Sequence, residues 1–441
     1  MPDRLNGRAF AFFKKQSNHH IIQMYLLKPR FFIGFAVLLC GVLSCQSTMP
    51  KATVKTGLDI VVEKQFPQFA GKRVGIICNH TACDKTGKHI VDLFHDSGVC
   101  RVTAIFGPEH GFRGMHADGQ KIHDDTDEKT GAVIYSLYGK IRKPTSEMLD
   151  NVDVLVYDIQ DVGARFYTYI TTMSLAMESA AEKGIPFVVL DRPNPIRGDR
   201  IEGPLLDMNF QSFVGHHKIP IRYSMTIGEL ARWTNGAGHL KDSAKADLTV
   251  IKMAGWNRQL WYDETDSPWI SPSPNMTHLG TATVYPGFCL LEGTNLSEGR
   301  GTKEPFLQFG APWIDEKSYA ESLNNMGLAG VTFEPVTYTP ITIPHVAYNP
   351  KYKNQLCRGV HINIADRDQF MPVRAMVLIL EKTKALYPDR FHLKSGIDRL
   401  YGSDKLRNAL VQGAPVADLI ESWNADRQMF YEQTYSYYLY K

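Results

Sequence analysis

A carboxylate and an imidazole, Glu109 and His110, stand side by side directly after an apolar run of the 441-residue chain. They lie in the segment AIFGPEHGFRG, where Gly-Pro precedes the pair and further glycines follow it. Burial raises the pKa of a carboxyl group, so a carboxylate at the tip of a buried strand can act as a general acid. His110 could tune this carboxylate as a second catalytic residue, or simply bond to the backbone. The segment therefore predicts proton-transfer chemistry at Glu109.

Three further apolar runs also end in polar or ionisable residues. These residues are Asn79 and His80, then Asp158, Asp161, Arg165 and Tyr167, and finally Asp191, Arg192 and Asn194. Ligands of open parallel sheets bind at the carboxyl ends of the strands. We therefore expect these side chains to gather with Glu109, with Asp158 as a catalytic candidate and the others in substrate binding. Asp158 and Asp161 could be acids, acceptors for substrate hydroxyls or partners of Arg165, and we expect one of them to pair with Arg165.

A second candidate cluster lies in the glycine-rich segment CLLEGTNLSEGRGTKEPF, which contains Glu292, Asn295, Glu298 and Arg300. Carboxylates and amides offer many hydrogen-bonding groups, and glycines permit close approach of a ligand to the backbone. Such a loop suits a ligand with many hydroxyl groups. Asn275, in the preceding segment SPSPNM, is expected to join the same cleft.

The elements that position these residues follow from the hydrophobic pattern. The strand-like runs are KRVGIICNH, CRVTAIFG, VDVLVYDIQD, IPFVVLDRPNP and ADLTVIKM. The helical patterns are KHIVDLFHDSG, PTSEMLDN, TTMSLAMESAAEKG and MTIGELARWTNG. The last of these begins with a capping box from Thr226 to Glu229. Near-continuous apolar strands that alternate with helices predict a parallel sheet covered on both faces. We predict an α/β, Rossmann-like domain over residues 57–275 and a smaller α+β auxiliary domain over residues 276–441. In the latter, VTFEPVTYTP and GVHINIAD are strand-like and PVRAMVLILEKTKALYP is helical.

The first 44 residues have the pattern of a signal peptide. Lys28 and Arg30 precede an apolar run, Phe31–Leu43, that is too short to span a membrane comfortably. The run ends in Val-Leu-Ser-Cys, which resembles the bacterial lipobox, in which the cysteine is lipidated. We predict a leader over residues 1–44, lipidation of Cys45, a tether over residues 45–56, and a membrane-anchored lipoprotein facing the periplasm or cell surface. An ordinary cleaved signal with an incidental cysteine is the alternative.

Composition and missing motifs argue against several functional classes. Without residues 1–44 the chain has 43 Lys and Arg against 45 Asp and Glu, and it has no basic stripe, so no nucleic-acid partner is expected. The sequence lacks GxGxxG, P-loop, HExxH, GxSxG and SxxK motifs. The segment GMHADGQKIHDDTDE is interpreted as a solvated acidic loop, and neither a metal nor another cofactor is predicted. The cysteines beyond Cys45 are sparse and odd in number, so free thiols are expected, with Cys78 and Cys83 as the one local pair that could form a disulfide.

Long segments of the chain resemble the exo-β-N-acetylmuramidase family, in collinear order from about Gly57 to near the C-terminus. They include GKRVGIICNHTACDKTGKHIVDLF, FGPEHGFRG, DVLVYDIQDVGARFYTYI, VLDRPNPIRGDRIEGPLLD, SPSPNM, YPGFCLLEGTNLSEGRGT and FGAPWID. The resemblance implies a glycosidase that removes terminal N-acetylmuramic acid from the non-reducing ends of peptidoglycan fragments. It also implies an active-site cleft between the two domains, with Glu109 as the main catalytic carboxylate. The implied partners are peptidoglycan-derived sugars and muropeptides, and the membrane through the lipid anchor.

Two other functions stay open on the sequence alone. A lipid-anchored binding protein could capture muropeptides in the same cleft without cleaving them. Another wall hydrolase, such as an amidase or deacetylase, would be expected to need a metal.

We expect Cys45→Ser to release the protein from membranes and to abolish cleavage of the leader before residue 45, because acylation requires the thiol. Fractionation measures the membrane association, and mass spectrometry of the N-terminus measures the processing. Unchanged association together with unchanged processing would show that the cysteine is incidental.

Overall fold

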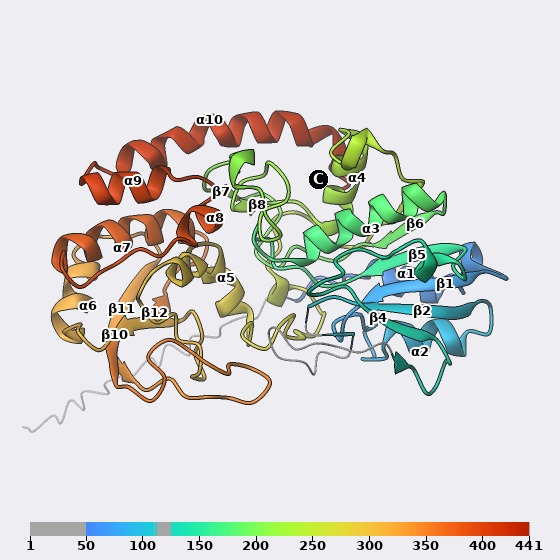
Figure 1. Cartoon of the computed structure of the whole chain (residues 1–441), viewed down its shortest axis with the longest axis horizontal. Coiled ribbons are helices and arrows are strands. Elements are labelled where there is room, and N and C mark those ends of the chain that lie inside the picture. Colours follow the sequence, from blue (N-terminus) through green and yellow to red (C-terminus); the bar gives the residue numbers. More distant parts are fainter. Residues whose placement is uncertain (1–49, 110, 113–124, 441) are drawn as a thin grey trace, which may run out of the picture. The chain divides into compact units, whose positions relative to one another are not determined.

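The computed structural model describes residues 50–109, 111–112 and 125–440. From Pro50 onward the chain forms one compact unit whose largest sheet has the strand order β3-β4-β2-β1-β5-β6-β9. Its strands are β1 (Arg73–Cys78), β2 (Arg101–Gly107), β3 (Asp125–Thr126), β4 (Val133–Ser136), β5 (Val154–Asp158), β6 (Phe187–Leu190) and β9 (Leu248–Ile251). All neighbours run parallel except β3, which pairs antiparallel with β4 at the edge. The predicted Rossmann-like α/β fold is confirmed (Figure 1).

Helices cover both faces of this sheet. On β5, Val154 and Val156 belong to a hydrophobic core shared with α1 (Gly57–Glu63) and α2 (Ile90–Asp96). The alternate residues Leu155 and Tyr157 belong to the opposite core, which contains α3 (Tyr169–Lys183) and α4 (Ile227–Gly236). Because side chains of a strand alternate between faces, a sheet buried on both faces needs near-continuous apolar strands.

Local signals in the sequence set several boundaries. The predicted capping box starts α4: the Thr226 hydroxyl accepts from the Glu229 amide at 3.2 Å, and the Glu229 carboxylate accepts from the Thr226 amide at 3.1 Å. Helix α3 ends at Gly184, which has φ of +70°. The predicted helix in PTSEMLDN is only a 3₁₀ turn, Glu147–Leu149. The sequence patterns missed β3 and β4 because β3 has two residues and β4 is only partly buried.

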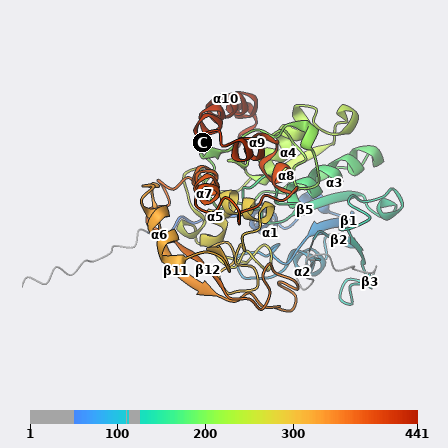
Figure 2. The same ribbon diagram turned by 60° about the vertical axis from the view of Figure 1, so that its left-hand side comes forward.

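The second half of the chain contains an antiparallel sheet with the order β10-β12-β11. Its elements are α5 (Leu279–Phe288), β10 (Gln308–Ala311), α6 (Glu316–Asn324), β11 (Val331–Tyr338), β12 (Cys357–Ile364), α7 (Pro372–Leu386), α8 (Ile397–Tyr401), α9 (Lys405–Gln412) and α10 (Ala417–Thr434). Helix α6 packs against β11 and β12, and α5 packs against α7 (Figure 2). The smaller α+β part is therefore confirmed, while the boundary between residues 275 and 276 stays a prediction.

The C-terminal residues return to the larger sheet after α10 (Figure 1). The Tyr440 hydroxyl donates to Asp191 Oδ2 at 2.6 Å, and the Leu439 amide donates to Glu229 Oε1 at 2.8 Å. Asp191 follows β6 directly, so this contact fixes the end of the chain to the carboxyl edge of the sheet. A short antiparallel pair, β7 (Ile201–Glu202) and β8 (Arg222–Tyr223), lies between β6 and α4 in the chain.

Two sequence predictions concern the leader and the cysteines. Residues 1–49, with the leader and Cys45, lie outside the described residues, and no helix of the described part is long and apolar enough to cross a bilayer. Cys83 is a free thiol whose Sγ donates to the His80 carbonyl at 3.4 Å, so no disulfide joins it to Cys78.

Candidate active site

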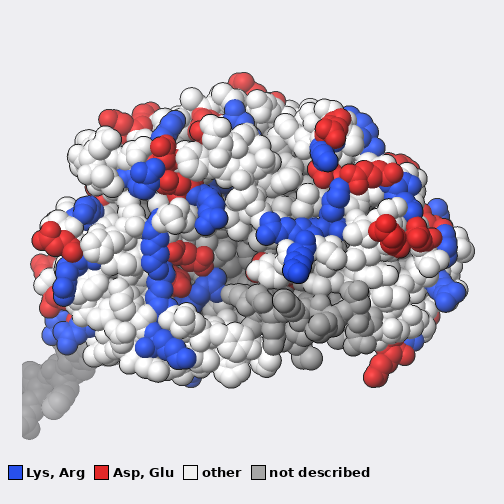
Figure 3. All heavy atoms as spheres, viewed as in Figure 1, with Lys and Arg blue, Asp and Glu red and all other residues white. Residues whose placement is uncertain are grey.

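A pocket of about 220 Å³ lies at the carboxyl edge of the parallel sheet. Strands β2 and β5 flank β1, and the chain adds further strands outward on both sides, so the topological switch point falls beside β1. The pocket is lined by the loops after β2 and β5, the start of α3, the segment before β8, α5 with the segments on both sides of it, and α8. The lining residues are Glu109, Phe166, Tyr167, Thr168, Tyr169, Val214, Ser273, Asn275, Tyr285, Cys289, Glu292, Arg300 and Leu400. The molecule is hollowed near the centre of the face shown in Figure 3, with acidic and basic side chains beside the hollow.

Glu109 stands on a tight turn after β2. The Gly111 amide donates to the Pro108 carbonyl at 2.9 Å, and Gly111 has φ of +75°. A Cβ on Gly107 would lie 2.8 Å from the Phe112 nitrogen, so only glycine lets the chain fold back there. These glycines serve the turn that presents the half-buried Glu109 to the pocket.

The Glu109 carboxylate is held by a neutral donor. The Thr168 hydroxyl donates to Glu109 Oε2 at 3.0 Å. Thr168 is the N-cap of α3, and a helix N-terminus favours nearby negative charge. Among the described residues no lysine or arginine pairs with Glu109. His110 lies outside the described residues, so its predicted role is untested.

The loop after β5 turns at Gly163, where φ is +76° and a Cβ would lie 2.6 Å from Asn194 Oδ1. Further along, Arg165 is fully buried, and its predicted ion pair with Asp158 or Asp161 is wrong. Its Nη1 donates to the carbonyls of Pro204 (2.9 Å) and Ile219 (2.8 Å), and its Nη2 donates to those of Leu400 (3.1 Å) and Tyr401 (2.7 Å). Burial lowers the pKa of Arg165 to about 9. This residue anchors the pocket wall and does not line the pocket.

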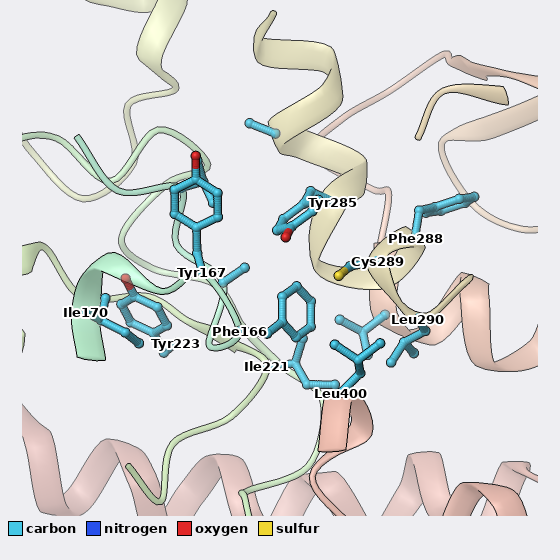
Figure 4. Close-up of a cluster of buried hydrophobic side chains, with 14 of the residues drawn as sticks. Phe166, Tyr167, Ile170, Ile221, Tyr223, Tyr285, Phe288, Cys289, Leu290 and Leu400 are labelled. Atoms are coloured by element: carbon cyan, nitrogen blue, oxygen red, sulfur yellow. The ribbon is translucent and has the colours of Figure 1, made fainter. Parts of the chain in front are cut away.

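The residues after Arg165 form an aromatic wall. Three pairs of rings pack edge to face. The distance between ring centroids is 5.3 Å for Phe166 and Tyr285, 5.9 Å for Tyr167 and Tyr285, and 4.9 Å for Tyr167 and Tyr169. Figure 4 shows Phe166 beside Tyr285, Cys289 and Leu400, side chains from three separate parts of the chain. Edge-to-face packing fixes the ring positions, so the wall is preformed.

Glu292 supplies a second carboxylate from the second half of the chain. Arg300 donates to Glu292 Oε1 from Nη2 at 2.9 Å and from Nε at 3.2 Å. The Arg300 guanidinium also lies 5.2 Å from the centroid of the Phe306 ring. Glu292 is thus oriented by a cation, whereas Glu109 is oriented by a hydroxyl.

Asn275, also predicted, reaches the pocket from a loop before α5. Its Nδ2 donates to the Val346 carbonyl at 3.0 Å. The structure therefore brings five predicted residues to one pocket: Glu109, Tyr167, Asn275, Glu292 and Arg300.

Several predicted residues lie in buried networks that do not line this pocket. Asp158 forms a two-pronged ion pair with Arg192, through Nε and, at 2.9 Å, through Nη2. Asp191 also accepts from the Gly228 amide at 2.8 Å, and burial raises its pKa to about 7. The Asn194 side-chain amide donates to the Met225 carbonyl at 3.0 Å. In these contacts Asp158, Arg192, Asp191 and Asn194 stabilise the fold around the sheet edge.

The remaining predicted residues have similar surroundings. Asn79 Oδ1 accepts from the Thr81 amide and hydroxyl, and the His80 ring bonds to the Ser271 carbonyl at 2.7 Å. Asn295 bonds the backbone of Arg390 and His392, and Glu298 lies 3.0 Å from Lys351 Nζ. Within the described ranges no group of three or more His, Cys, Asp or Glu side chains is placed to hold a metal ion, and His116 lies outside those ranges.

Sequence reasoning missed Thr168, Ser273 and Tyr285 as pocket residues. Thr168 directly follows Tyr167, and Ser273 lies two positions before Asn275, so widening each motif would have found them. Tyr285 lies inside α5, and nothing in its local pattern separates it from a core residue.

Comparison with known proteins identifies close relatives. Residues 74–280 match the family description "Exo-beta-N-acetylmuramidase NamZ, N-terminal", and residues 283–440 match its C-terminal counterpart. The chain is 44% identical over 399 residues to the peptidoglycan beta-N-acetylmuramidase NamZ of Bacillus subtilis, covering 90% of this chain and 94% of the relative. Two crystal structures of DUF1343 family proteins from Bacteroides fragilis are similar. The first has a TM-score of 0.82 and 38% sequence identity, and the match covers 89% of this chain and 100% of the other chain. The second has a TM-score of 0.72 and 33% sequence identity, and the match covers 88% of this chain and 99% of the other chain.

Asp161, in the loop after β5, yields a prediction on stability. It accepts from the Gly163 amide at 2.7 Å and from the Tyr223 hydroxyl, yet burial raises its pKa to about 7. The unfolded chain releases this proton near pH ~3.9, so the folded state holds the extra proton from about pH 4 to pH 7. Stability from this group is therefore lost as pH rises through that window, by at most about 1.4 kcal/mol per pH unit.

We expect Asp161→Asn, which cannot ionise, to remove the part of the pH dependence of stability that arises from Asp161. Urea unfolding at pH 5, 6, 7 and 8 should show the free energy of unfolding of the parent protein falling relative to the variant up to about pH 7 and then levelling off. A constant difference between the two across this range would contradict burial of a protonated Asp161.

Proposed function

The chain belongs to the exo-β-N-acetylmuramidase family and is a glycoside hydrolase, and from this premise we propose that it releases terminal N-acetylmuramic acid from the non-reducing ends of peptidoglycan fragments. The size of the pocket supports an exo action. Its volume of about 220 Å³ is below the roughly 300–1,000 Å³ typical of sites for drug-sized ligands. A single terminal sugar fits such a space better than a continuous glycan strand does.

The observation that carries the proposal is the presence of two carboxylates, Glu109 and Glu292, in one pocket. Most glycosidases use a pair of carboxyl groups on either side of the scissile bond, one to transfer a proton and one to act on the anomeric carbon directly or through water. The two groups here have different surroundings. Arg300 holds Glu292 through two hydrogen bonds, while Glu109 accepts a hydrogen bond from the Thr168 hydroxyl.

We assign proton transfer to Glu109. It stands on a fixed turn, and Thr168 aims its carboxylate from the start of α3. A single general acid or base is typically worth 10²–10⁴-fold in rate. The remaining catalysis comes from positioning of the sugar and from the second carboxylate.

We also propose that the enzyme is held on a membrane through a lipid on Cys45. The lipobox-like end of the leader supports this proposal. An anchored enzyme would act on wall fragments close to the membrane surface.

We expect Glu109→Gln to lower kcat on a natural disaccharide by about 10²–10⁴-fold with little change in KM, because glutamine keeps the shape but has no titrating proton. The defect should shrink on 4-nitrophenyl β-N-acetylmuramide, since nitrophenolate leaves with little protonation. Release of N-acetylmuramic acid measures the first rate, and absorbance measures the second.

Glu334→Gln, at an exposed position on β11, is the matched control and should behave like the parent protein. Near-normal turnover of the natural disaccharide by Glu109→Gln would remove Glu109 from the reaction. A parent protein that binds muropeptides but never cleaves them would favour the binding-protein alternative. Activity that is lost in EDTA and restored by one divalent ion would favour a metal-dependent hydrolase.

A further inference from the structure

Two buried polar atoms in the pocket wall form no hydrogen bond of ordinary geometry among the described residues: Asn275 Oδ1 and the Tyr167 hydroxyl, which has the Ser273 hydroxyl close beside it. Asn275 is 3% exposed and Tyr167 is 8% exposed. Folded proteins pair the large majority of buried polar side-chain atoms, because an unpaired one has lost its water without compensation. Both residues line the same pocket, so a ligand in that pocket is the natural partner.

The orientation of the Asn275 amide is fixed. Its Nδ2 donates to the Val346 carbonyl at 3.0 Å, and a carbonyl can only accept. The unpaired atom is therefore the amide oxygen, which needs an N–H or O–H donor from the ligand.

The Tyr167 hydroxyl offers the complementary group. Burial raises its pKa well above the ordinary range of a tyrosine, against an opposing effect of the nearby Ser273 hydroxyl, so it carries its proton and can donate. Its ring packs edge to face with Tyr169 and Tyr285, which fixes the direction of the hydroxyl. The ligand should supply an acceptor at this point.

Another part of the pocket wall is apolar. Phe166, Cys289 and Leu400 are buried and line the pocket, and Figure 4 shows them facing a common space with Tyr285. A ligand group in contact with this wall should end in a hydrocarbon.

We propose that Asn275 and Tyr167 form a recognition site for the acetamido group of the terminal sugar. The amide N–H would donate to Asn275 Oδ1, the amide carbonyl would accept from Tyr167, and the methyl group would lie against the apolar wall. A sugar hydroxyl would leave the apolar wall unused, and a carboxylate would be repelled by the amide oxygen. This inference rests on the proposed function, because it takes an N-acetylated sugar as the occupant.

The test compares two ligands by calorimetry: N-acetylmuramic acid and its 2-acetoxy analogue, in which an ester oxygen replaces the amide N–H. We expect Asn275→Ala to weaken binding of N-acetylmuramic acid by about 10–100-fold, the usual effect of leaving a buried group unpaired. The same variant should weaken binding of the analogue less than threefold. Asn235→Ala is the matched control, because both polar atoms of that half-buried amide bond the Ala246 backbone.

Tyr167→Phe separates recognition from folding. Removal of this hydroxyl should lower the melting temperature less than Tyr223→Phe does, while it weakens binding of N-acetylmuramic acid about tenfold or more. Tyr223→Phe, which removes a buried hydroxyl bonded to Asp161, should lower the melting temperature.

Equal weakening of both ligands by Asn275→Ala, or undiminished binding by Tyr167→Phe, would overturn the acetamido site. Turnover of a disaccharide by the parent protein is measured in parallel. Turnover without the expected ligand discrimination would overturn the site and leave the muramidase function standing. Discrimination without turnover would leave the site standing and overturn the function.

Discussion

The pocket depends on a buried guanidinium that has no carboxylate partner among the described residues. Arg165 donates to four backbone carbonyls. Two belong to Pro204 and Ile219, which lie between β7 and β8, and two belong to residues 400 and 401 at the end of α8. A helix C-terminus favours a cation, and Gly402 leaves room for the side chain, since a Cβ there would lie 2.5 Å from Nη2. Removing Arg165 would leave four carbonyls short of a donor. This one side chain therefore ties the loop of Phe166, Tyr167 and Thr168 to the helix that carries Leu400.

With that loop fixed, both halves of the chain can contribute to one site. The first half supplies Glu109 on its glycine turn, and the second supplies Glu292 with its partner Arg300. Each carboxylate has its own hydrogen-bond donor, so neither depends on the sugar for its orientation. Preorganised groups of this kind favour the transition state because little reorganisation is left for the moment of reaction.

The sequence predicts the parallel sheet well because buried strands such as VLVYD are apolar on both faces. It also predicts the pocket position, since strand ends after β2 and β5 deliver Glu109 and Tyr167. It fails for Arg165, whose carbonyl partners lie up to 236 residues away and leave no side-chain signal in the sequence. The pairing of Asp158 with Arg192 was missed for a related reason: charge alone does not say which neighbour at a sheet edge is closer. Asp191 and Asn194 also follow a strand, but their side chains bond distant parts of the chain, Asp191 at Tyr440 and Asn194 at Met225.

The proposed function requires the terminal sugar to occupy the pocket that Glu109 and Glu292 line. A crystal structure of the Glu109→Gln enzyme with an uncleaved N-acetylmuramyl disaccharide tests it most directly. We expect the N-acetylmuramyl ring to lie against the wall of Phe166 and Tyr285, with the glycosidic oxygen within hydrogen-bonding distance of residue 109. A disaccharide bound elsewhere, or bound with residue 109 remote from the glycosidic bond, would contradict it.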